Sequence, residues 1–415
     1  MAHTAQLKRL VIIGGGFAGI RVALDLARRK TPGLKITLIS SKPHFEYYPT
    51  LYRVVTGRSA LQVCIPLFEI FEGLNVEVIE DFITQVNLKD HVLSGGIGSP
   101  YAYDYLVLAP GAETGYFNIP GLPELSYGFK SIGEALKLRQ HLHDTLTPSA
   151  DSTTPQEKKV QAAHFMVIGG GPTGVEMSGE LMQYAKKLAR LHGSDQSMVT
   201  VDLIEAAPRL LPTMPADISN RVYDQLHRRG VNIFLNRTVI KEEVDELFLK
   251  DAQIKTNTVI WTAGVKTSRL IGLIEGLELD KRGRVVVDNH LQAKGHAHVY
   301  VLGDAASTLY AGLAQTADED GAFVAQNIVH NLTKAKQTAY VPHRPIYAIP
   351  AGPGWAVVLW GETRIYGRIA SLLRAAADFR YLLSILSPLK AWAVFSKHGV
   401  LSEDCPVCIS ETPAK

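Results

Sequence analysis

The sequence predicts an α/β protein with two doubly wound, Rossmann-like dinucleotide-binding domains and a C-terminal amphipathic helical region. Two short apolar runs, about 155 residues apart, are each typical of a buried parallel strand and are each followed by three glycines spaced G-x-G-x-x-G. A helix-like pattern follows each turn, which is the context that dinucleotide binding requires. The runs are Leu10–Ile13 and Phe165–Ile168, and the glycines are Gly14, Gly16 and Gly19 in the first motif and Gly169, Gly171 and Gly174 in the second.

Each glycine of such a motif has its own task. The first permits a tight turn, the second lets the backbone approach a pyrophosphate, and the third lets the helix pack closely on its strand. The phosphates then lie at the positive end of the helix dipole. Two motifs therefore predict two bound dinucleotides.

The first unit continues with a helix over 20–29, a turn at 31–33 and a second strand over 35–39. A carboxylate usually follows this strand, because it accepts hydrogen bonds from the adenosine ribose. Ser40 stands there instead. Its hydroxyl is expected to contact the first cofactor through a weaker hydrogen bond than a carboxylate would make.

The middle of the chain alternates strand and helix patterns. No cysteine precedes Cys64, so the redox-active cysteine pair that disulfide reductases carry in this region is absent. Strands are expected over 75–79 and 82–87, and the stretch 103–112 is expected to be a strand that runs into a glycine turn. A hairpin is expected around 95–98, a helix over 131–146 and a polar surface loop over 151–159.

The second unit carries acidic residues at two informative positions. Glu176 and Glu180, four residues apart in the helix after Gly174, share one helix face. Glu205 ends the strand over 198–204, where a carboxylate binds the adenosine ribose diol and repels a 2′-phosphate. This position favours NADH over NADPH, although Arg209 could compensate in part and a solvated Glu205 is the alternative.

The composition is ordinary for a protein of two or three domains. The chain has 415 residues, of which 46% are hydrophobic and 20% charged, and its formal net charge of +3 does not indicate nucleic acid as a partner. Three scattered cysteines do not form a disulfide framework, which indicates a reducing compartment. Neither a signal peptide nor a membrane-spanning run is expected.

Several segments carry a resemblance to a known family. They are Gly174–Glu176 with Gly179–Leu181, Val259–Val265, Arg282–Asp288, Val299–Ala305 and Ala314–Ala317. With them, the chain resembles the type II NADH dehydrogenases along nearly its whole length. These flavoproteins pass electrons from NADH to quinone without pumping protons. The resemblance implies a glutathione-reductase-like arrangement with FAD and NADH as cofactors, and a hydride that passes from the nicotinamide to flavin N5 across the crevice between the domains.

The resemblance also assigns roles to single residues. Glu176 is implied to lie near the flavin–nicotinamide contact, where it would tune the flavin or move protons, and Gln315 to border the quinone pocket. Asp304 is implied to hold the ribityl chain. The Gly264 turn is implied to approach the nicotinamide nucleotide. Further cofactor contacts are expected at Ala109, Gly111, Gly303, Ala317 and Ala263.

One segment departs from the family pattern. After Ala317 the family commonly has a pair of glutamines, whereas this chain has Asp318, Glu319 and Asp320. Carboxylates at a helix start are favourable for the helix dipole. They lack the amide donors that a quinone carbonyl could use.

The expected domain boundaries follow from the two motifs and the resemblance. An FAD-binding domain over 1–120 and 285–340 is expected to be interrupted by an NADH-binding domain over 121–284. A membrane-associating region over 341–415 follows, which places the protein peripherally on the cytoplasmic face of a membrane.

The segment from Gly361 to Phe395 predicts that membrane association. Its apolar residues recur mostly every three or four positions, with cations among them, which suits an interfacial helix. Packing on the protein's own core or on a second copy in a homodimer is the alternative. The apolar residues are Ile365, Ile369, Leu372, Leu373, Ala376, Phe379, Leu383 and Leu386, and the cations are Arg364, Arg368, Arg374, Arg380 and Lys390.

The last motif is the pair Cys405 and Cys408, which could be a redox dithiol or an incidental pair. With only His398 nearby, the sequence offers no complete metal-ligand set. Two alternatives to quinone reduction stay open. One is a related flavin oxidoreductase whose acceptor is a protein or the tail dithiol, and the other is a redox-sensing flavoprotein that turns over only incidentally.

Overall fold

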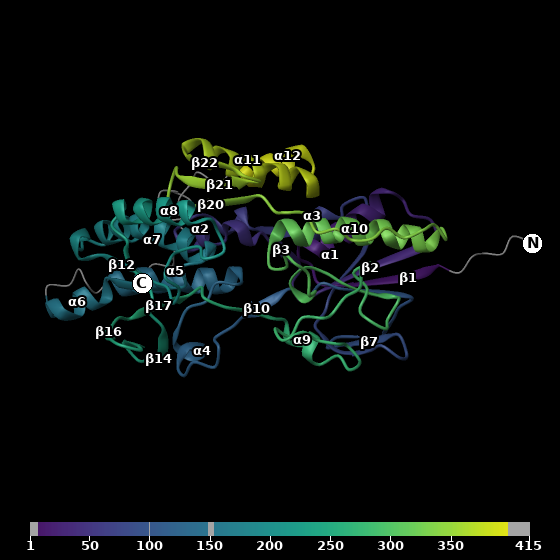
Figure 1. Cartoon of the computed structure of the whole chain (residues 1–415), viewed down its shortest axis with the longest axis horizontal. Coiled ribbons are helices and arrows are strands. Elements are labelled where there is room, and N and C mark those ends of the chain that lie inside the picture. Colours follow the sequence, from purple (N-terminus) through teal and green to yellow (C-terminus); the bar gives the residue numbers. More distant parts are fainter. Residues whose placement is uncertain (1–6, 99, 148–152, 397–415) are drawn as a thin grey trace, which may run out of the picture. The chain divides into compact units, whose positions relative to one another are not determined.

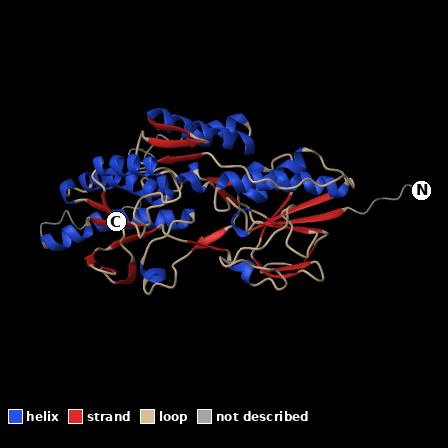
Figure 2. Cartoon of the chain, in the orientation of Figure 1, coloured by secondary structure: helices blue, strands red, loops and turns tan. Residues whose placement is uncertain are grey.

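The computed structural model describes residues 7–98, 100–147 and 153–396. The chain forms two compact units, each assembled from three stretches of sequence. Unit 1 comprises Met1–Glu46, Cys64–Glu113 and Val265–Pro345, and unit 2 comprises Tyr47–Val63, Thr114–Gly264 and Ile346–Lys415. Figure 1 names the elements of both units and Figure 2 separates their helices from their strands. The domain boundaries expected from the sequence stay a prediction.

Unit 1 is built, within its described residues, on a five-stranded parallel sheet with the order β19-β9-β1-β2-β5. The chain winds outward from β1 in both directions, so the strand order reverses between β1 and β9. In a doubly wound sheet this reversal marks the place where a nucleotide binds. The strands are β1 (Lys8–Ile13), β2 (Leu34–Ser40), β5 (Glu77–Glu80), β9 (Tyr105–Leu108) and β19 (Val299–Val301).

Two helices of unit 1 pack closely together beside this sheet (Figure 1). They are α1 (Phe17–Arg28) and α10 (Ala314–Leu332). A Cβ on Gly321 of α10 would lie 2.6 Å from the backbone oxygen of Ala18 in α1, so glycine is needed for this approach. The remaining elements are β3 (His44–Glu46), β4 (Cys64–Pro66), α3 (Leu67–Ile70), β6 (Ile83–Asn87), β7 (Val92–Gly95), β8 (Tyr101–Ala102), α9 (Arg269–Gly272) and η5 (Gly303–Ala305).

The antiparallel sheet β6-β7-β8 covers part of the parallel sheet. Val11 and Ile13 of β1 share an apolar core with Ile83 of β6 and Leu93 of β7. Where the chain passes between the units, β10 (Ala112–Thr114) pairs with β18 (Val265–Thr267).

Unit 2 repeats the same plan with a parallel sheet in the order β13-β12-β11-β17, counted over described residues. Its strand order reverses between β11 and β17. The strands are β11 (His164–Ile168), β12 (Thr200–Ile204), β13 (Asn232–Phe234) and β17 (Thr258–Trp261). Its helices before the tail are η1 (Tyr48–Thr50), α2 (Tyr52–Val55), η2 (Ala60–Gln62), α4 (Leu122–Leu125), α5 (Ile132–Leu146), α6 (Gln156–Ala162), α7 (Pro172–Leu191), η4 (Gln196–Met198) and α8 (Ala216–Arg228).

Two antiparallel sheets complete unit 2. One contains β14 (Val239–Glu243), β15 (Glu246–Leu249) and β16 (Gln253–Lys255). The other contains β20 (Tyr347–Pro350), β21 (Ala356–Trp360) and β22 (Thr363–Gly367), and it packs against α11 (Arg368–Ile385), which α12 (Pro388–Ser396) follows (Figure 2).

The predicted fold class is confirmed, and two element predictions are wrong in part. The polar stretch over 151–159 was expected to be a loop, but α6 begins at Gln156. Pro155 directly precedes it, and proline is well tolerated at a helix start. The amphipathic stretch from Gly361 was expected to be helical, but Thr363–Gly367 forms the edge strand β22 before α11 begins.

None of the described helices combines the length and the apolar character needed to cross a bilayer.

Candidate functional site

The first glycine motif closes the turn between β1 and α1 at the point where the strand order of unit 1 reverses. Gly14 has φ +112°, and a Cβ there would overlap the carbonyl oxygen of Ala109 at the end of β9. A Cβ on Gly19 would overlap the carbonyl oxygen of Gly14. A Cβ on Gly16 would meet no described atom within 4 Å outside its chain neighbours. The backbone around Gly16 therefore faces open space at the N-terminus of α1, as pyrophosphate binding requires.

The second motif repeats this geometry in unit 2. Gly169 has φ +111°, and a Cβ there would lie 2.8 Å from the Cα of Ala263. A Cβ on Gly174 would overlap the carbonyl oxygen of Gly169, whereas one on Gly171 would again meet no described atom within 4 Å. Gly171 caps the N-terminus of α7 with ordinary extended dihedral angles. Each unit thus offers an open anion-binding turn at its own switch point.

Glu205 lies directly after β12 and faces the second motif. Its two carboxylate oxygens accept hydrogen bonds of 2.6 Å from the backbone N–H groups of Gly170 and Ala207. Arg209 donates to the carbonyl oxygens of Pro212 and Met214 and to the hydroxyl of Ser219. These bonds hold the guanidinium against its own loop and α8, so the geometry does not favour the idea that Arg209 compensates for Glu205.

Ser40 takes the corresponding place in unit 1. A Cβ on Gly15 would lie 2.7 Å from its Oγ, so the hydroxyl faces the first motif as Glu205 faces the second. The Ser40 hydroxyl donates to the carbonyl oxygen of Lys42 over 2.8 Å and accepts from the Lys42 N–H over 3.2 Å. One lone pair is left to accept a hydrogen bond from a ribose hydroxyl.

The turn that carries Asp304 is held by a buried carboxyl from α10. Asp320 accepts hydrogen bonds from the Gly303 N–H over 3.1 Å and from the Tyr340 hydroxyl over 2.6 Å. Burial raises the pKa of Asp320 to about 6. A Cβ on Gly303 would lie 3.3 Å from the Cβ of Ala317, so this end of α10 lies beside the Asp304 turn.

The other two acidic residues of α10 also have partners. Asp318 forms a two-pronged pair with Arg21 of α1, with N–O distances of 2.8 and 3.0 Å. The Gln315 amide donates to Glu319 over 2.8 Å. Because α10 begins at Ala314, these carboxylates lie in its second turn and not at its start, where we expected them. All three carboxylates of this stretch are therefore engaged in contacts within unit 1.

The remaining predicted contacts divide between the units. Gly111 of unit 1 has φ +72°, and a Cβ there would meet no described atom within 4 Å outside its chain neighbours. In unit 2, a Cβ on Gly264 would overlap the carbonyl oxygen of Gly115 and lie 2.7 Å from the ring of Phe117. Glycine at 264 is therefore already required by the packing of unit 2. Gln315 belongs to unit 1 and Glu176 to unit 2.

Glu176 lies in a nearly buried polar cluster of unit 2. Its carboxyl is 13% exposed, and its Oε1 lies 3.9 Å from Nη1 of Arg374, itself 12% exposed, from α11. Burial, only partly offset by the nearby guanidinium groups of Arg374 and Arg53, raises the pKa of Glu176 to about 7. A carboxyl with this pKa can both give and take a proton near neutral pH.

The cluster includes residues that sequence reasoning missed. Arg374 was predicted as one cation of an exposed basic face. That prediction is wrong, because the side chain is only 12% exposed and donates hydrogen bonds inside unit 2. Neither Tyr47 nor Asp378 was predicted as a member of such a polar cluster. For Asp378 the signal was helical spacing, since Ala370, Arg374, Asp378, Leu382 and Ile385 recur every three or four residues and form the inward face of α11.

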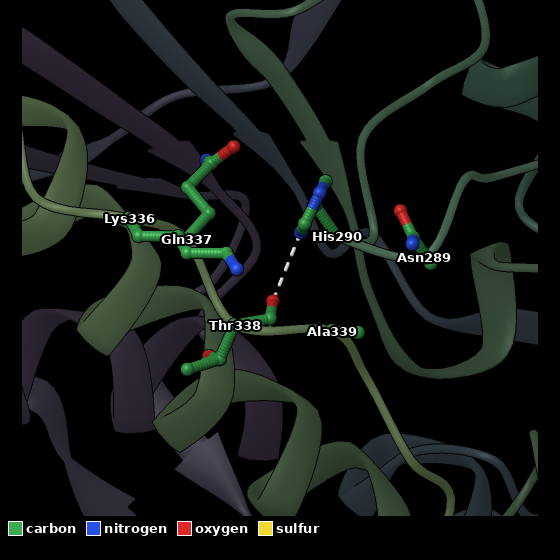
Figure 3. Close-up of a pocket in the computed structure, with 6 residues that line it drawn as sticks. All are labelled: Asn289, His290, Lys336, Gln337, Thr338 and Ala339. Atoms are coloured by element: carbon green, nitrogen blue, oxygen red, sulfur yellow. Dashed lines mark hydrogen bonds between the residues drawn. The ribbon is translucent and has the colours of Figure 1, made fainter.

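A separate pocket of about 710 Å³ opens on unit 1 (Figure 3). Its lining includes His290, whose Nδ1 lies 2.9 Å from the carbonyl oxygen of Thr338, together with Asn289, Lys336, Gln337 and Ala339. None of the site residues predicted from the sequence lines it. The pair Cys405 and Cys408 lies outside the described residues.

Comparison with known proteins identifies the family. Residues 8–321 match the model of the pyridine nucleotide-disulphide oxidoreductase family. The type II NADH:quinone oxidoreductase Ndh of Mycobacterium tuberculosis is 31% identical, over 95% of this chain and 89% of that protein. A type II NADH:quinone oxidoreductase of Staphylococcus haemolyticus is 29% identical, over 91% of this chain and 96% of that protein.

Solved structures share the fold. The structure of NDH2 from Plasmodium falciparum in complex with NADH covers 95% of this chain and 98% of its own, with a TM-score of 0.85 and 20% identity. The sulfide:quinone oxidoreductase of Aquifex aeolicus covers 98% of this chain and 96% of its own, with a TM-score of 0.77 and 20% identity. The family binds FAD and a nicotinamide nucleotide. The chain therefore belongs to the pyridine nucleotide-disulphide oxidoreductase family and, within it, to the type II NADH:quinone oxidoreductases.

Proposed function

We propose that this protein oxidises NADH and reduces a membrane quinone through FAD, without pumping protons. The observation that carries the proposal is the pair of open glycine turns, each at the switch point of its own parallel sheet, in a chain that aligns with type II NADH:quinone oxidoreductases over 91 to 95% of its length. Unit 1 would hold FAD and unit 2 would hold NADH. The residues fit both dinucleotides, because Gly16 and Gly171 leave room for a pyrophosphate at a helix N-terminus.

The protein's own groups would position the two cofactors and stabilise their bound charges. The N-termini of α1 and α7 hold the two pyrophosphates, Ser40 and Glu205 accept hydrogen bonds from the ribose hydroxyls, and Asp304 holds the ribityl chain. Flavin bound at these residues would supply the two-electron redox chemistry. Glu176 supplies or removes a proton at its carboxyl oxygens, which its near-neutral pKa permits.

Anaerobic titration of the purified yellow protein tests the proposal. NADH is expected to bleach the flavin absorbance. A quinone is expected to restore that absorbance within the time of one steady-state catalytic cycle. A small disulfide or a ferredoxin is not expected to do so. Rapid reoxidation by a disulfide that is lost in Cys405→Ser would favour a thiol acceptor, and a flavin that is reduced once and then stalls with every quinone would favour a redox sensor.

Glu205 predicts the choice of nucleotide. Placing a 2′-phosphate beside this half-buried carboxylate should cost about 1.4 to 3 kcal/mol, so we expect kcat/KM for NADH to exceed that for NADPH about 10- to 100-fold. Glu205→Ala should narrow the ratio, whereas Glu246→Ala on β15 should leave it unchanged. Equal steady-state use of both nucleotides by the unsubstituted protein would contradict this role.

The tail supports a proposal of peripheral membrane binding, and we propose the cytoplasmic face as its side of the membrane. Its apolar side chains project outward on α11 and α12, with Leu372 70% and Leu389 85% exposed. Trp392 of α12 is 59% exposed, and its ring contacts Phe379 of α11. The cations Arg368 and Arg380 of α11 are exposed, whereas Arg374 is nearly buried and does not contribute to a basic surface. We therefore expect apolar burial to contribute more than charge.

Liposome co-sedimentation tests this binding. Replacing Leu372, Leu389 and Trp392 together by serine should weaken binding to anionic vesicles about 100-fold or more, since each side chain contributes roughly 1 to 2 kcal/mol when inserted. The matched control replaces Val160, Leu191 and Leu273, exposed apolar residues elsewhere, by serine. Reduction of the flavin by NADH should be unchanged in both. If the full-length protein does not bind vesicles but is dimeric in solution, this face is a homodimer interface instead.

A further inference from the structure

Arg374 is held by three acceptors inside unit 2. Its Nε donates to Oδ1 of Asp378 over 3.0 Å, its Nη1 to the carbonyl oxygen of Ala348 over 2.7 Å, and its Nη2 to the carbonyl oxygen of Pro49 over 2.7 Å. These bonds tie α11 to β20 and to η1. They also fix the plane of the guanidinium group, since a rigid fork held at three nitrogens cannot rotate freely.

Asp378 is the most enclosed carboxylate of the cluster. It is 2% exposed, and the Tyr47 hydroxyl donates to its Oδ1 over 2.7 Å. Its Oδ2 is buried and has no hydrogen-bond partner among the described residues. A bare carboxylate oxygen in such surroundings is costly. The hydrogen bonds from Tyr47 and Arg374 are both accepted by the same oxygen, Oδ1. Arg374 is the cation that forms an ion pair with Asp378.

Glu176 approaches the same guanidinium from α7 but makes no hydrogen bond with it in the structure. The closest approach is the 3.9 Å between Oε1 and Nη1. Nη1 already donates to Ala348, and the Nε edge is occupied by Asp378. The other groups that act on Glu176 are Arg53 and Tyr52 of α2 and Glu180 of α7. Arg53 donates to the Tyr52 hydroxyl over 3.2 Å.

We propose that Asp378 is a positioning residue for Glu176. It holds the Arg374 guanidinium at ion-pair distance from Glu176 but out of hydrogen-bond contact, so that Glu176 can exchange a proton during turnover. This inference rests on the proposed proton role of Glu176. If the Asp378 charge were absent, the Nε edge of Arg374 would lose its anionic partner, and the attraction of this cation for Glu176 would no longer be opposed, which favours the ionised form of Glu176.

The sign of the effect follows from the charges. The Asp378 carboxylate raises the pKa of Glu176, and the Arg374 and Arg53 cations lower it. Asp378→Asn keeps the shape and removes the negative charge. The ionisation of Glu176 should therefore move to lower pH, by about one pH unit for a neighbouring like charge that is removed. Tyr47→Phe removes only a hydrogen bond and should move it less.

The experiment measures the pH dependence of kcat/KM for a soluble quinone in the holoenzyme, together with the infrared absorbance of protonated carboxyls from pH 5 to 9. The unsubstituted enzyme should show an ionisation near neutral pH that is lost in Glu176→Gln. Asp378→Asn should shift that ionisation downward, and Asp378→Glu should restore it toward the original value. Should Asp378→Asn not yield holoenzyme, Asp378→Ser carries the same expectation.

The outcomes separate this inference from the proposed function. An ionisation that persists in Glu176→Gln would remove the proton role of Glu176 and leave nothing for Asp378 to position. An ionisation that is lost in Glu176→Gln but does not move in Asp378→Asn would overturn the positioning role alone. An equal shift in Tyr47→Phe would also overturn it, because the loss of one hydrogen bond to Asp378, with its charge still in place, would then be sufficient.

Discussion

Gly16→Val is expected to fold and to lack bound flavin. Gly16 has φ −93° and ψ −170°, which valine adopts without strain, and a Cβ there would meet no described protein atom within 4 Å outside its chain neighbours. The added methyl groups would instead fill the space that a pyrophosphate needs at the N-terminus of α1. Loss of about 4 kcal/mol or more of binding free energy corresponds to a drop in affinity of roughly 1,000-fold. The ratio of flavin to protein absorbance after purification measures it.

Gly171→Val should separate the two sites. Its turn in unit 2 has the same open geometry, so this variant should stay yellow but should no longer be reduced by NADH at ordinary concentrations. Gly133→Val is the matched control, because a Cβ on Gly133 in α5 also meets no described atom within 4 Å outside its own helix and chain neighbours. Gly133→Val should keep its bound flavin and should still be reduced by NADH. Full flavin content in Gly16→Val, or unchanged NADH reduction in Gly171→Val, would contradict the assignment of these turns.

The sequence was sufficient for the parts of the fold that depend on local chemistry. A glycine turn between strand and helix has strict requirements, so its position follows from the residues alone, and the structure places Gly14 and Gly169 at φ +112° and +111°. The same holds for the strand ends at Ser40 and Glu205, which face the turns at Gly15 and Gly170.

The tail shows why the rest could not be predicted. Residues 369, 372, 373 and 383 of α11 form an apolar face, and residues 370, 382 and 385 form another. Periodicity finds a helix from either face but does not say which one is buried. The burial of Arg374 and Asp378 depends on β20, η1 and α7, which come from distant parts of the sequence. An arginine followed four residues later by an aspartate, within an apolar stripe, is the signal that would have selected the correct face.

Arg374→Met should destabilise the docking of α11 by about 3 to 5 kcal/mol, the usual cost of leaving a buried charge without its partner. The variant keeps the length and apolar volume of the side chain but removes the cation shared by Asp378 and Glu176. It also leaves the carbonyl oxygens of Ala348 and Pro49 without their N–H donors. Arg374→Lys should recover only part of this loss, because an ammonium group cannot reproduce the planar fork.

Amide hydrogen exchange of α11 in the FAD-bound protein measures this cost locally, without assuming that both units unfold together. Opening should become about 150- to 5,000-fold more frequent in Arg374→Met. Arg380→Met, an exposed cation on the same helix, should change it by less than about threefold, that is, roughly 0.5 kcal/mol. Adding Asp378→Asn to Arg374→Met should restore part of the protection, since the two charges act on each other. Equal exchange in Arg374→Met and Arg380→Met would mean that the buried cation does not anchor α11.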